Sequence, residues 1–267
     1  MKILALDFDG VIVDSVLDSL FVGHNAYLRF YNPKKKQYFG EEIFTFENWE
    51  KIQKRFKKEI EYYRTFRPYI RGATDYGLIQ KLLEEKRVIR NQEEFDVYRN
   101  NVDFDFEGYE KAFYKEREQL QSINYRAWFN LEPPYRAIIE GIKILLADNV
   151  KIVIATSNRR KAIMQSFTPE YFGFYIEPKD ILDKRFGEDK SEQMKHIVNA
   201  YQVAFKDIIF VDDQVSHLIQ TKPLGIRIFL AGWSYATEGQ KKEAKKQKIP
   251  IIEKEEDFYK VLLNELK

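Results

Sequence analysis

The stretch Lys2–Asp14, which reads KILALDFDGVIVD, decides how the rest of the chain is interpreted. It contains the apolar run Ile3–Leu6, two acids at Asp7 and Asp9, and a glycine at Gly10, before a second apolar run begins. A short apolar run ended by turn residues predicts a buried strand of a parallel sheet. Both acids should then lie where this strand leaves the sheet, which is the edge at which open α/β sheets bind ligands.

The four residues Asp7–Gly10, a D-x-D-G pattern, do not by themselves show whether Asp7 and Asp9 form a binding site. Two carboxylates this close repel each other at an intermediate dielectric constant unless a cation or a proton intervenes. An isolated D-x-D-G is more often an ordinary turn after a strand than a binding site. Partners elsewhere in the chain therefore have to decide between the two interpretations.

Length and composition are those of an ordinary globular protein. The 267 residues suffice for one large domain or two modest ones, and 44 Lys plus Arg nearly balance 42 Asp plus Glu. This balance argues against nucleic acid or an anionic membrane as the partner, so any phosphate binding has to come from a local site.

The absence of cysteine excludes thiolate metal sites and thiol catalysis. We find neither a signal peptide nor an apolar run of about 18 residues, and we expect a cytoplasmic protein.

Residues 15–131 change in character after the opening strand. Strand-like apolar runs disappear, and helix-like segments rich in Lys, Glu, Tyr and Phe replace them, for example over 48–67 and 107–120. We interpret 15–131 as a mostly helical second domain. It is inserted into a core that consists of residues 1–14 plus 132–267.

Alternating strands and helices return near Pro133 and continue along the chain. The pattern predicts helices at 138–146, 191–202 and 256–266, and strands at 151–155, 173–176, 208–211, 226–230 and 249–252. The last strand is split by Pro250, which places it at an edge. Strands separated by helices imply a doubly wound parallel sheet, so the predicted fold class is α/β with a helical insertion after the first strand.

Three of the predicted strands end in polar residues. Asp7 and Asp9 follow the first, Thr156, Ser157 and Asn158 follow the second, and Asp212 and Asp213 follow a later one. Because the carboxyl ends of parallel strands lie at the same edge, these side chains can converge. Four converging carboxylates need a hard cation, and oxygen ligands without cysteine favour Mg²⁺.

A phosphoryl group bound at this edge would also need hydrogen-bond donors and a positive charge. The hydroxyls and backbone N–H groups of Thr156–Asn158, where a helix begins, suit phosphate oxygens. Lys190 opens a later helix and could neutralise charge there, and Lys184 is its competitor.

Together, these residues resemble the four ordered motifs of the haloacid dehalogenase superfamily, in the form that its phosphatases carry. The motifs are D-x-D-G-V at Asp7 to Val11, an apolar strand ending in Thr or Ser at IVIATSN with Thr156, a Lys ahead of a helix, best matched by Lys190, and an apolar strand ending in two acids at IIFVDD with Asp212 and Asp213. The segment LAGWSYAT, residues 230–237, is similar to the segment that commonly comes after the fourth motif in phosphoglycolate phosphatase relatives.

The resemblance implies a role for each matched residue. Asp7 would attack phosphorus and form an aspartyl-phosphate, while Asp9 would act as general acid and then general base, its main-chain carbonyl also touching Mg²⁺. Thr156 would hold a phosphate oxygen, and Lys190 would orient Asp7 and neutralise charge. The remaining assignments are phosphate binding for Gly10, Ser157 and Asn158, and completion of the metal site for Asp213 with Asp212.

Comparison with the superfamily's patterns narrows the chemistry. Asp9 argues against haloacid chemistry, since dehalogenase members lack an acid there, and no lysine of the insert is identifiable as the Schiff-base lysine of phosphonate cleavage. His217 stands where many relatives carry a further acid, which leaves the metal geometry less determined than the nucleophile.

The helical insert between the first two motifs resembles a C1 cap, a lid that would enclose the site.

Other polar residues of the chain have plainer interpretations. Arg64, Arg67 and Arg71 of the insert form a basic cluster that could reach an anionic substrate, but a helix that packs through its tyrosines and extends its arginines to solvent is the favoured interpretation. The three histidines, His24, His196 and His217, lack the spacing of metal ligands and are interpreted as ordinary surface or packed residues.

We therefore expect a Mg²⁺-dependent phosphomonoester hydrolase that acts on a small phosphorylated metabolite. The sequence names neither the ester nor the oligomeric state nor the cap residues that set specificity. Two alternatives stay open: a phosphotransferase such as a sugar-phosphate mutase on the same core, and a non-catalytic binding module that keeps the scaffold.

Overall fold

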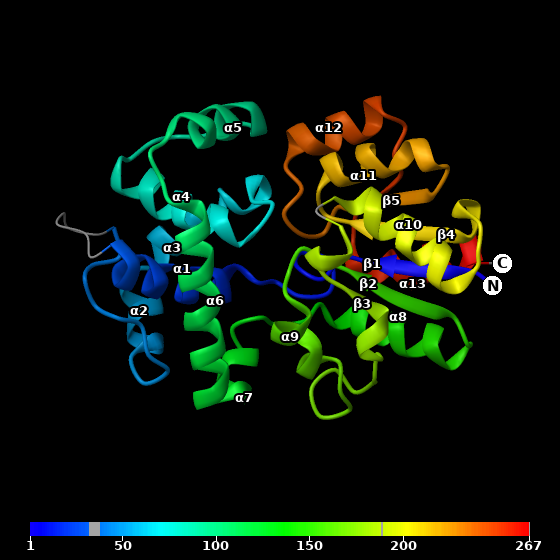
Figure 1. The fold of residues 1–267 in the computed structure, drawn as a ribbon, viewed down its shortest axis with the longest axis horizontal. Coiled ribbons are helices and arrows are strands. Elements are labelled where there is room, and N and C mark those ends of the chain that lie inside the picture. Colours follow the sequence, from blue (N-terminus) through cyan, green and yellow to red (C-terminus); the bar gives the residue numbers. More distant parts are fainter. Residues whose placement is uncertain (32–37, 188, 267) are drawn as a thin grey trace. The chain divides into compact units, whose positions relative to one another are not determined.

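The computed structural model describes residues 1–31, 38–187 and 189–266. The chain divides into two compact units: Met1–Asp14 with Pro133–Lys267, here named the α/β unit, and Ser15–Glu132, here named the helical unit (Figure 1). Among the described residues, no helix has both the length and the apolar character that crossing a membrane requires.

The α/β unit is built on a six-stranded parallel sheet in the order β3-β2-β1-β4-β5-β6. The strands are β1 (Ile3–Leu6), β2 (Lys151–Ala155), β3 (Ile181–Leu182), β4 (Ile208–Asp212), β5 (Arg227–Ala231) and β6 (Ile251–Ile252). The opening strand β1 lies in the interior of the sheet, where Leu6 is in register with Ile154 of β2 and Val211 of β4. This register brings the residues that come after the three strands to one edge.

Helices cover both faces of the sheet. They are α8 (Arg136–Ala147), α9 (Arg160–Ile163), α10 (Lys190–Tyr201), α11 (Val215–Thr221), α12 (Glu238–Lys246) and α13 (Phe258–Leu266). Met194 of α10 and Leu218 of α11 share one buried apolar cluster with Ala5 and Phe210 of the strands. On the other side of the strands lies α8 (Figure 1). There a Cβ at Gly141 would come within 2.9 Å of the Phe258 ring, so α8 packs closely on α13.

Short 3-10 turns connect several of these elements. They are η2 (Met164–Ser166), η3 (Pro178–Asp180), η4 (Lys184–Phe186), η5 (Phe205–Asp207), η6 (Lys222–Leu224) and η7 (Glu255–Asp257). The predicted α/β class with a doubly wound parallel sheet is confirmed, and Ile251–Ile252 is an edge strand as Pro250 indicated. The terminal helix begins at Phe258, after η7.

The strand predicted at 173–176 is wrong, because the third strand of the sheet is Ile181–Leu182 instead. Gly173 has a positive φ of 81°, which interrupts an extended run. The apolar side chains of the segment are buried in an aromatic cluster rather than in a ladder: the Phe174 ring lies 5.9 Å from that of Phe172 and 6.3 Å from that of Phe167. Phe174 and Ile176 of this segment are buried, but outside the sheet.

The helical unit confirms the mostly helical insertion after the first strand. Its helices are α1 (Val16–Tyr31), α2 (Trp49–Arg55), α3 (Lys57–Arg64), α4 (Ala73–Glu84), α5 (Gln92–Asn101), α6 (Phe106–Ile123) and α7 (Tyr125–Phe129), with one 3-10 turn, η1 (Arg67–Tyr69). The single helix expected over 48–67 is broken at Phe56, which caps both α2 and α3. α1 packs against α4 and α6, and their aromatic residues fill the core.

Candidate active site

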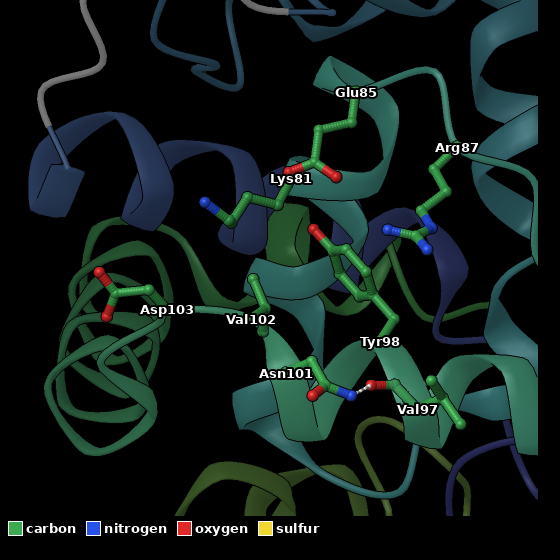
Figure 2. Close-up of a pocket in the computed structure, with 8 residues that line it drawn as sticks. All are labelled: Lys81, Glu85, Arg87, Val97, Tyr98, Asn101, Val102 and Asp103. Atoms are coloured by element: carbon green, nitrogen blue, oxygen red, sulfur yellow. Dashed lines mark hydrogen bonds between the residues drawn. The ribbon is translucent and has the colours of Figure 1, made fainter.

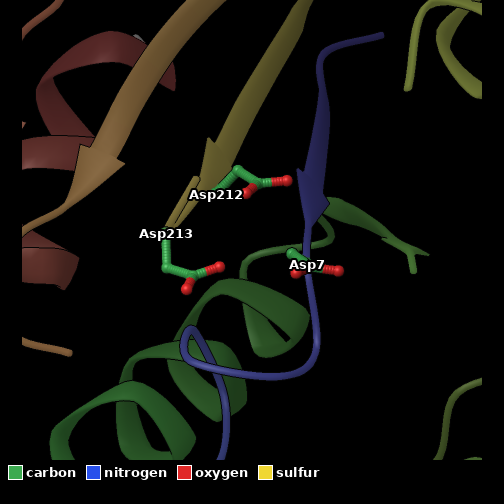
Figure 3. A group of neighbouring side chains, drawn as sticks. All are labelled: Asp7, Asp212 and Asp213. Carbon is green, nitrogen blue, oxygen red and sulfur yellow. The ribbon is translucent and has the colours of Figure 1, made fainter. Parts of the chain in front are cut away.

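Three buried carboxylates meet at the carboxyl edge of the sheet (Figure 3). Asp7 follows β1, Asp212 is the last residue of β4, and Asp213 comes next. Each of them offers an oxygen that lies within 4.8 Å of an oxygen from the other two. The convergence results from the parallel register, since Asp7 and Asp212 each stand one residue beyond the pair Leu6–Val211.

Lys190 brings a buried positive charge to this group. It is the first residue of α10, and the preceding Asp189 caps that helix by accepting from the N–H of Glu192 at 3.0 Å. Its Nζ donates to Asp7 Oδ1 at 2.9 Å and lies 3.6 Å from Asp212 Oδ2. Burial alone would lower the pKa of Lys190, but Asp7 and Asp212 outweigh it and raise the pKa above its ordinary value. The side chain is therefore an ammonium.

Lys184, the competing lysine, lies on η4 with an exposed side chain. Of the two lysines, the geometry brings Lys190 to the carboxylates.

The Asp7 carboxylate keeps a proton more readily than an ordinary aspartate. Burial raises its pKa to about 6, although Lys190 opposes the shift, and the neighbouring charges of Asp212 and Asp9 add to it. One ammonium thus does not compensate the crowded negative charge. A cation bound among the three carboxylates would favour ionised Asp7.

Asp212 is stabilised as a carboxylate from two sides. Besides Lys190, the ring of His217 lies close, with Nδ1 3.0 Å from Asp212 Oδ2, and the backbone N–H of Gln214 donates to Oδ1 at 2.8 Å. Burial alone would raise the pKa of Asp212, but His217, Lys190 and the Gln214 N–H together lower it. His217 is thus a packed histidine, one of the two interpretations drawn from the sequence, and its partner is an acid of this cluster. Its place in the first turn of α11, directly after the acidic strand end, is the signal that could have indicated this contact.

The loop Thr156–Asn158 follows β2 and is held by neighbouring strands and helices. The Thr156 N–H donates to the Leu182 carbonyl at 2.9 Å, and Thr156 Oγ1 accepts from the Asn158 N–H at 3.0 Å. Asn158 Nδ2 in turn donates to Asp9 Oδ2 at 3.4 Å, while Ser157 is half-buried. Asp9 and this loop are therefore neighbours at the same edge.

Gln193 is a supporting residue that sequence reasoning missed. It lies on α10, three residues after Lys190, and its Nε2 donates to the Thr156 carbonyl at 2.9 Å. The spacing of three residues on one helix could have indicated that both side chains point to the same strand ends.

Gly10 is required where the chain turns beside Asp213. Its φ is +77°, and a Cβ there would lie 2.8 Å from the Asp213 carboxylate and 2.7 Å from the Tyr235 ring. Tyr235 belongs to the segment 230–237, and its hydroxyl donates to Asp14 Oδ1 at 2.9 Å. The opening motif and this later segment thus enclose the acidic cluster.

The carboxylates fit a hard divalent cation. All the groups that converge are oxygen donors, they are buried, and Gly10 leaves the space in front of Asp213 clear of a side chain. Asp7, Asp212 and Asp213 could hold such an ion; the carboxylate of Asp9 is not part of this group.

The arginines of the insert, Arg64, Arg67 and Arg71, do not all extend to solvent. Arg67 is buried and donates to Ser15 Oγ at 3.1 Å, contrary to the favoured interpretation. Arg71 forms a bidentate ion pair with Asp96 at 2.8 Å, at the surface of the helical unit.

Comparison with known proteins agrees with the arrangement of the motifs. Residues 1–219 match the family model of haloacid dehalogenase-like hydrolases. The chain belongs to this hydrolase family. The resemblance drawn from the motifs is thereby confirmed, and the protein is an enzyme of the hydrolase class. No curated protein matches the chain in sequence.

Solved structures share the fold along almost the whole chain. A predicted phosphoglycolate phosphatase from Haemophilus somnus has a TM-score of 0.61 at 13% identity, and a predicted phosphatase from Clostridium acetobutylicum has 0.62 at 13%; both alignments cover 98% of each chain. A candidate β-phosphoglucomutase from Thermotoga maritima has a TM-score of 0.52 at 14% identity and covers 99% of each chain. At these identities the likeness concerns the fold.

Proposed function

We propose that the protein is a Mg²⁺-dependent phosphomonoester hydrolase that forms an aspartyl-phosphate at Asp7. One observation carries the proposal: the buried carboxylate of Asp7 is held by the Lys190 ammonium at 2.9 Å, while a second acid, Asp9, lies two residues on and contacts the Thr156–Asn158 loop. A carboxylate nucleophile, a separate acid and a fixed cation are the groups that two-step phosphoryl transfer needs.

In the first step, a carboxylate oxygen of Asp7 forms a bond to phosphorus, and the bond from phosphorus to the ester oxygen breaks. Asp9 gives its proton to the leaving oxygen. In the second step, water attacks phosphorus, its proton returns to Asp9, and the bond to Asp7 breaks. The products are an alcohol and inorganic phosphate, and the Asp7 carboxylate and the protonated Asp9 are regenerated.

The surrounding residues position the phosphoryl group. The Lys190 ammonium orients Asp7 and offsets negative charge as it builds up. The Thr156 hydroxyl and the donors of Ser157 and Asn158 are the groups proposed to bind phosphate oxygens. Gly10 allows close approach of the backbone. Mg²⁺ held by Asp7, Asp213 and Asp212 would supply the additional positive charge that the three carboxylates lack.

The substrate is proposed to be a small phosphorylated metabolite, and the helical unit is proposed to act as its C1-type cap. The helical unit enters the chain between Asp14 and Pro133, that is, between the first and second motifs. An inserted unit in this position is suited to select small substrates and to exclude water.

A panel of phosphate esters tests this proposal: sugar phosphates, phosphoglycolate, nucleotides and amino-acid phosphates, each with Mg²⁺. At least one ester should release inorganic phosphate, and Asp7→Asn should lower the rate by about 10³-fold or more. Asp96→Asn, which removes an exposed carboxylate of the helical unit, is the matched control and should leave the rate unchanged. An Asp7→Asn variant as active as the parent would exclude the mechanism.

A phosphotransferase is the second candidate, because the same site could hand the phosphoryl group to a hydroxyl instead of water. The similarity in fold to a candidate β-phosphoglucomutase is the observation that keeps it in view. Isomerised sugar phosphate without net release of phosphate would decide for this reaction. A non-catalytic module, by contrast, would show no turnover with any ester and no Mg²⁺-dependent binding of beryllofluoride that Asp7→Asn abolishes.

A further inference from the structure

A cavity of the α/β unit lies beside α10, and none of the residues that line it belongs to the acidic cluster. It has a volume of about 460 Å³, which is in the range of pockets that hold small organic ligands. Its lining comprises Arg160, Lys179, Phe186, His196, Ala200 and Tyr201. None of these residues has a proposed role in phosphoryl transfer.

The charge of this lining has one sign. Arg160 and Lys179 are cations, and no lining residue is acidic. The pocket of the helical unit in Figure 2 is different, since its lining mixes Lys81 and Arg87 with two acids, Glu85 and Asp103. Of the two cavities, the one beside α10 therefore favours an anion.

Arg160 supplies a fixed guanidinium to the lining of this cavity. Its Nε donates to the Ile181 carbonyl at 2.7 Å, and its guanidinium lies over the Phe186 ring at 5.0 Å, so the side chain is fixed in place. Its Nη2 is buried and has no hydrogen-bond partner in the described part of the chain. A guanidinium that is held in place and is not neutralised by a carboxylate of the lining is suited to bind an anionic group in the cavity.

Lys179 adds charge at the rim, where its ammonium pairs with Glu177 at 3.0 Å. Both side chains are more than half exposed, so this pair is weak and can give way to a stronger anion.

The other walls are apolar and aromatic. His196 packs edge-on against Phe186, with 4.6 Å between ring centroids, and Ala200 and Tyr201 lie on the last turn of α10. The hydroxyl of Tyr201 donates to Asp180, which turns the polar end of this side chain toward η3. A ligand that fills the cavity would thus join an anionic group to a flat apolar portion.

We propose that this cavity binds an organic phosphate with a planar apolar portion, the chemistry of a nucleoside monophosphate. The phosphate would accept hydrogen bonds from Arg160, with Lys179 and His196 nearby, and the planar portion would lie against the aromatic walls. The site is separate from the acidic cluster and does not depend on the proposed hydrolase activity. It shares its framework with that cluster, because α10 also carries Lys190 and Arg160 follows Asn158 by two residues.

Calorimetric titration of AMP tests the proposal. The protein is the full chain with Asp7→Asn, so that the probe is not consumed, and EDTA is present, so that metal-dependent binding at the acidic cluster is suppressed. We expect AMP to bind, inorganic phosphate and ribose 5-phosphate to bind more weakly, and adenosine to bind weakest. A ranking in which inorganic phosphate equals AMP would contradict the planar portion of the ligand.

Two further substitutions in the same background locate the binding. Arg160→Gln removes the guanidinium and should weaken AMP binding about tenfold or more, and Ala200→Trp fills the cavity from an exposed position and should do the same without changing charge. Lys195→Gln is the matched control, since it removes a cation from the exposed face of α10 outside the cavity. Absence of AMP binding, or an affinity that both cavity variants leave unchanged, would overturn the proposal.

Discussion

The helical unit and the sheet edge both bury carboxylates, but they compensate the charge differently. Each buried acid among the described residues of the helical unit has an arginine within 4.0 Å: the pairs are Asp18 with Arg117, Asp75 with Arg99, Glu116 with Arg29 and Glu132 with Arg117. Asp18 also accepts from Trp128 Nε1 at 2.7 Å. In this unit the chain itself supplies the positive charge.

At the sheet edge, three buried carboxylates face one buried ammonium, that of Lys190, with His217 at the side of Asp212. Within the described residues of the α/β unit, this surplus of negative charge is confined to the sheet edge. The other buried acids there are paired: Asp180 with Lys151, and Asp183 with Arg185.

This difference supports the sheet edge as the place where the proposed cation binds. Uncompensated buried charge is strongly destabilising, so a protein that retains it at one site and pairs it everywhere else has a use for it there. Burial raises the pKa of Asp7 to about 6, and the charges of Asp212 and Asp9 add to this shift. The two kinds of buried charge should therefore respond differently to substitution and to Mg²⁺.

Removal of Lys190 should have the largest effect. Lys190→Met takes away the cation that orients Asp7 and should lower phosphate-ester hydrolysis by about 10³-fold or more, because the developing negative charge loses its nearest partner. Lys184→Met, which changes an exposed lysine of η4, serves as the control and should stay within about twofold of the parent. Steady-state kinetics with the best ester of the panel measures both. The reverse ranking would assign the catalytic lysine to Lys184.

Removal of Arg117 should affect stability rather than Mg²⁺ binding. Arg117→Met leaves Asp18 and Glu132 buried without their guanidinium, and we expect the free energy of unfolding to fall by about 3–5 kcal/mol. Arg71→Met removes one partner of the surface pair with Asp96 and should cost about 1 kcal/mol or less. Urea unfolding with and without Mg²⁺ gives the comparison. If Mg²⁺ stabilised Arg117→Met more than it stabilises the parent, the distinction between the two regions would not hold.

A buried histidine makes the helical unit sensitive to acid. His24 of α1 stacks on Phe44 at 4.1 Å, and its Nε2–H donates to the Glu42 carbonyl at 3.0 Å. Burial lowers the pKa of His24 from 6.5 to about 4. Between these two values the unfolded chain binds the proton more readily than the folded chain. Stability should therefore fall as the pH drops from 6.5 to 4, by up to about 3 kcal/mol.

The variant His24→Gln, which keeps a donor for the Glu42 carbonyl, isolates this contribution. Its free energy of unfolding should change less than that of the parent over the same pH range, as urea titrations at several pH values would show. Equal pH dependence of parent and variant would contradict a neutral, buried His24.

The fold and the residues at the strand ends were accessible from the sequence because they depend on short-range patterns. Apolar runs ended by turn residues predicted β1, β2 and β4, and parallel pairing then requires Asp7, Thr156 and Asp212 to lie at one edge. Where local pattern and tertiary packing disagree, the prediction failed. The segment 173–176 has the composition of a strand, but its phenylalanine is buried against Phe167 and Phe172 instead of in the sheet.

The contacts that tune the site were not accessible in this way. His217 meets Asp212 across a turn between strand and helix, and Gln193 reaches Thr156 from a different segment of the chain. Their places on α11 and α10 indicate the side that each residue faces, but not the partner that it contacts. The burial of Arg67 likewise depends on Ser15, 52 residues away in the sequence. Partners of this kind are decided by how elements pack after they have formed.

Mg²⁺ should stabilise the protein through the sheet edge alone. A ligand that binds only the folded state adds about 2.7 kcal/mol at a concentration of 100 times its Kd, and the three carboxylates are the group suited to bind it. Asp213→Asn removes one carboxylate and should reduce this gain, while the variant itself folds, because it also removes repulsion from the cluster. Glu132→Gln, an equally conservative change at a buried acid of the helical unit, should keep the full gain. Thermal unfolding over a series of Mg²⁺ concentrations distinguishes the two variants. An equal response from both would mean that Mg²⁺ binds elsewhere, and the surplus of negative charge at the sheet edge would then need another cation or a retained proton.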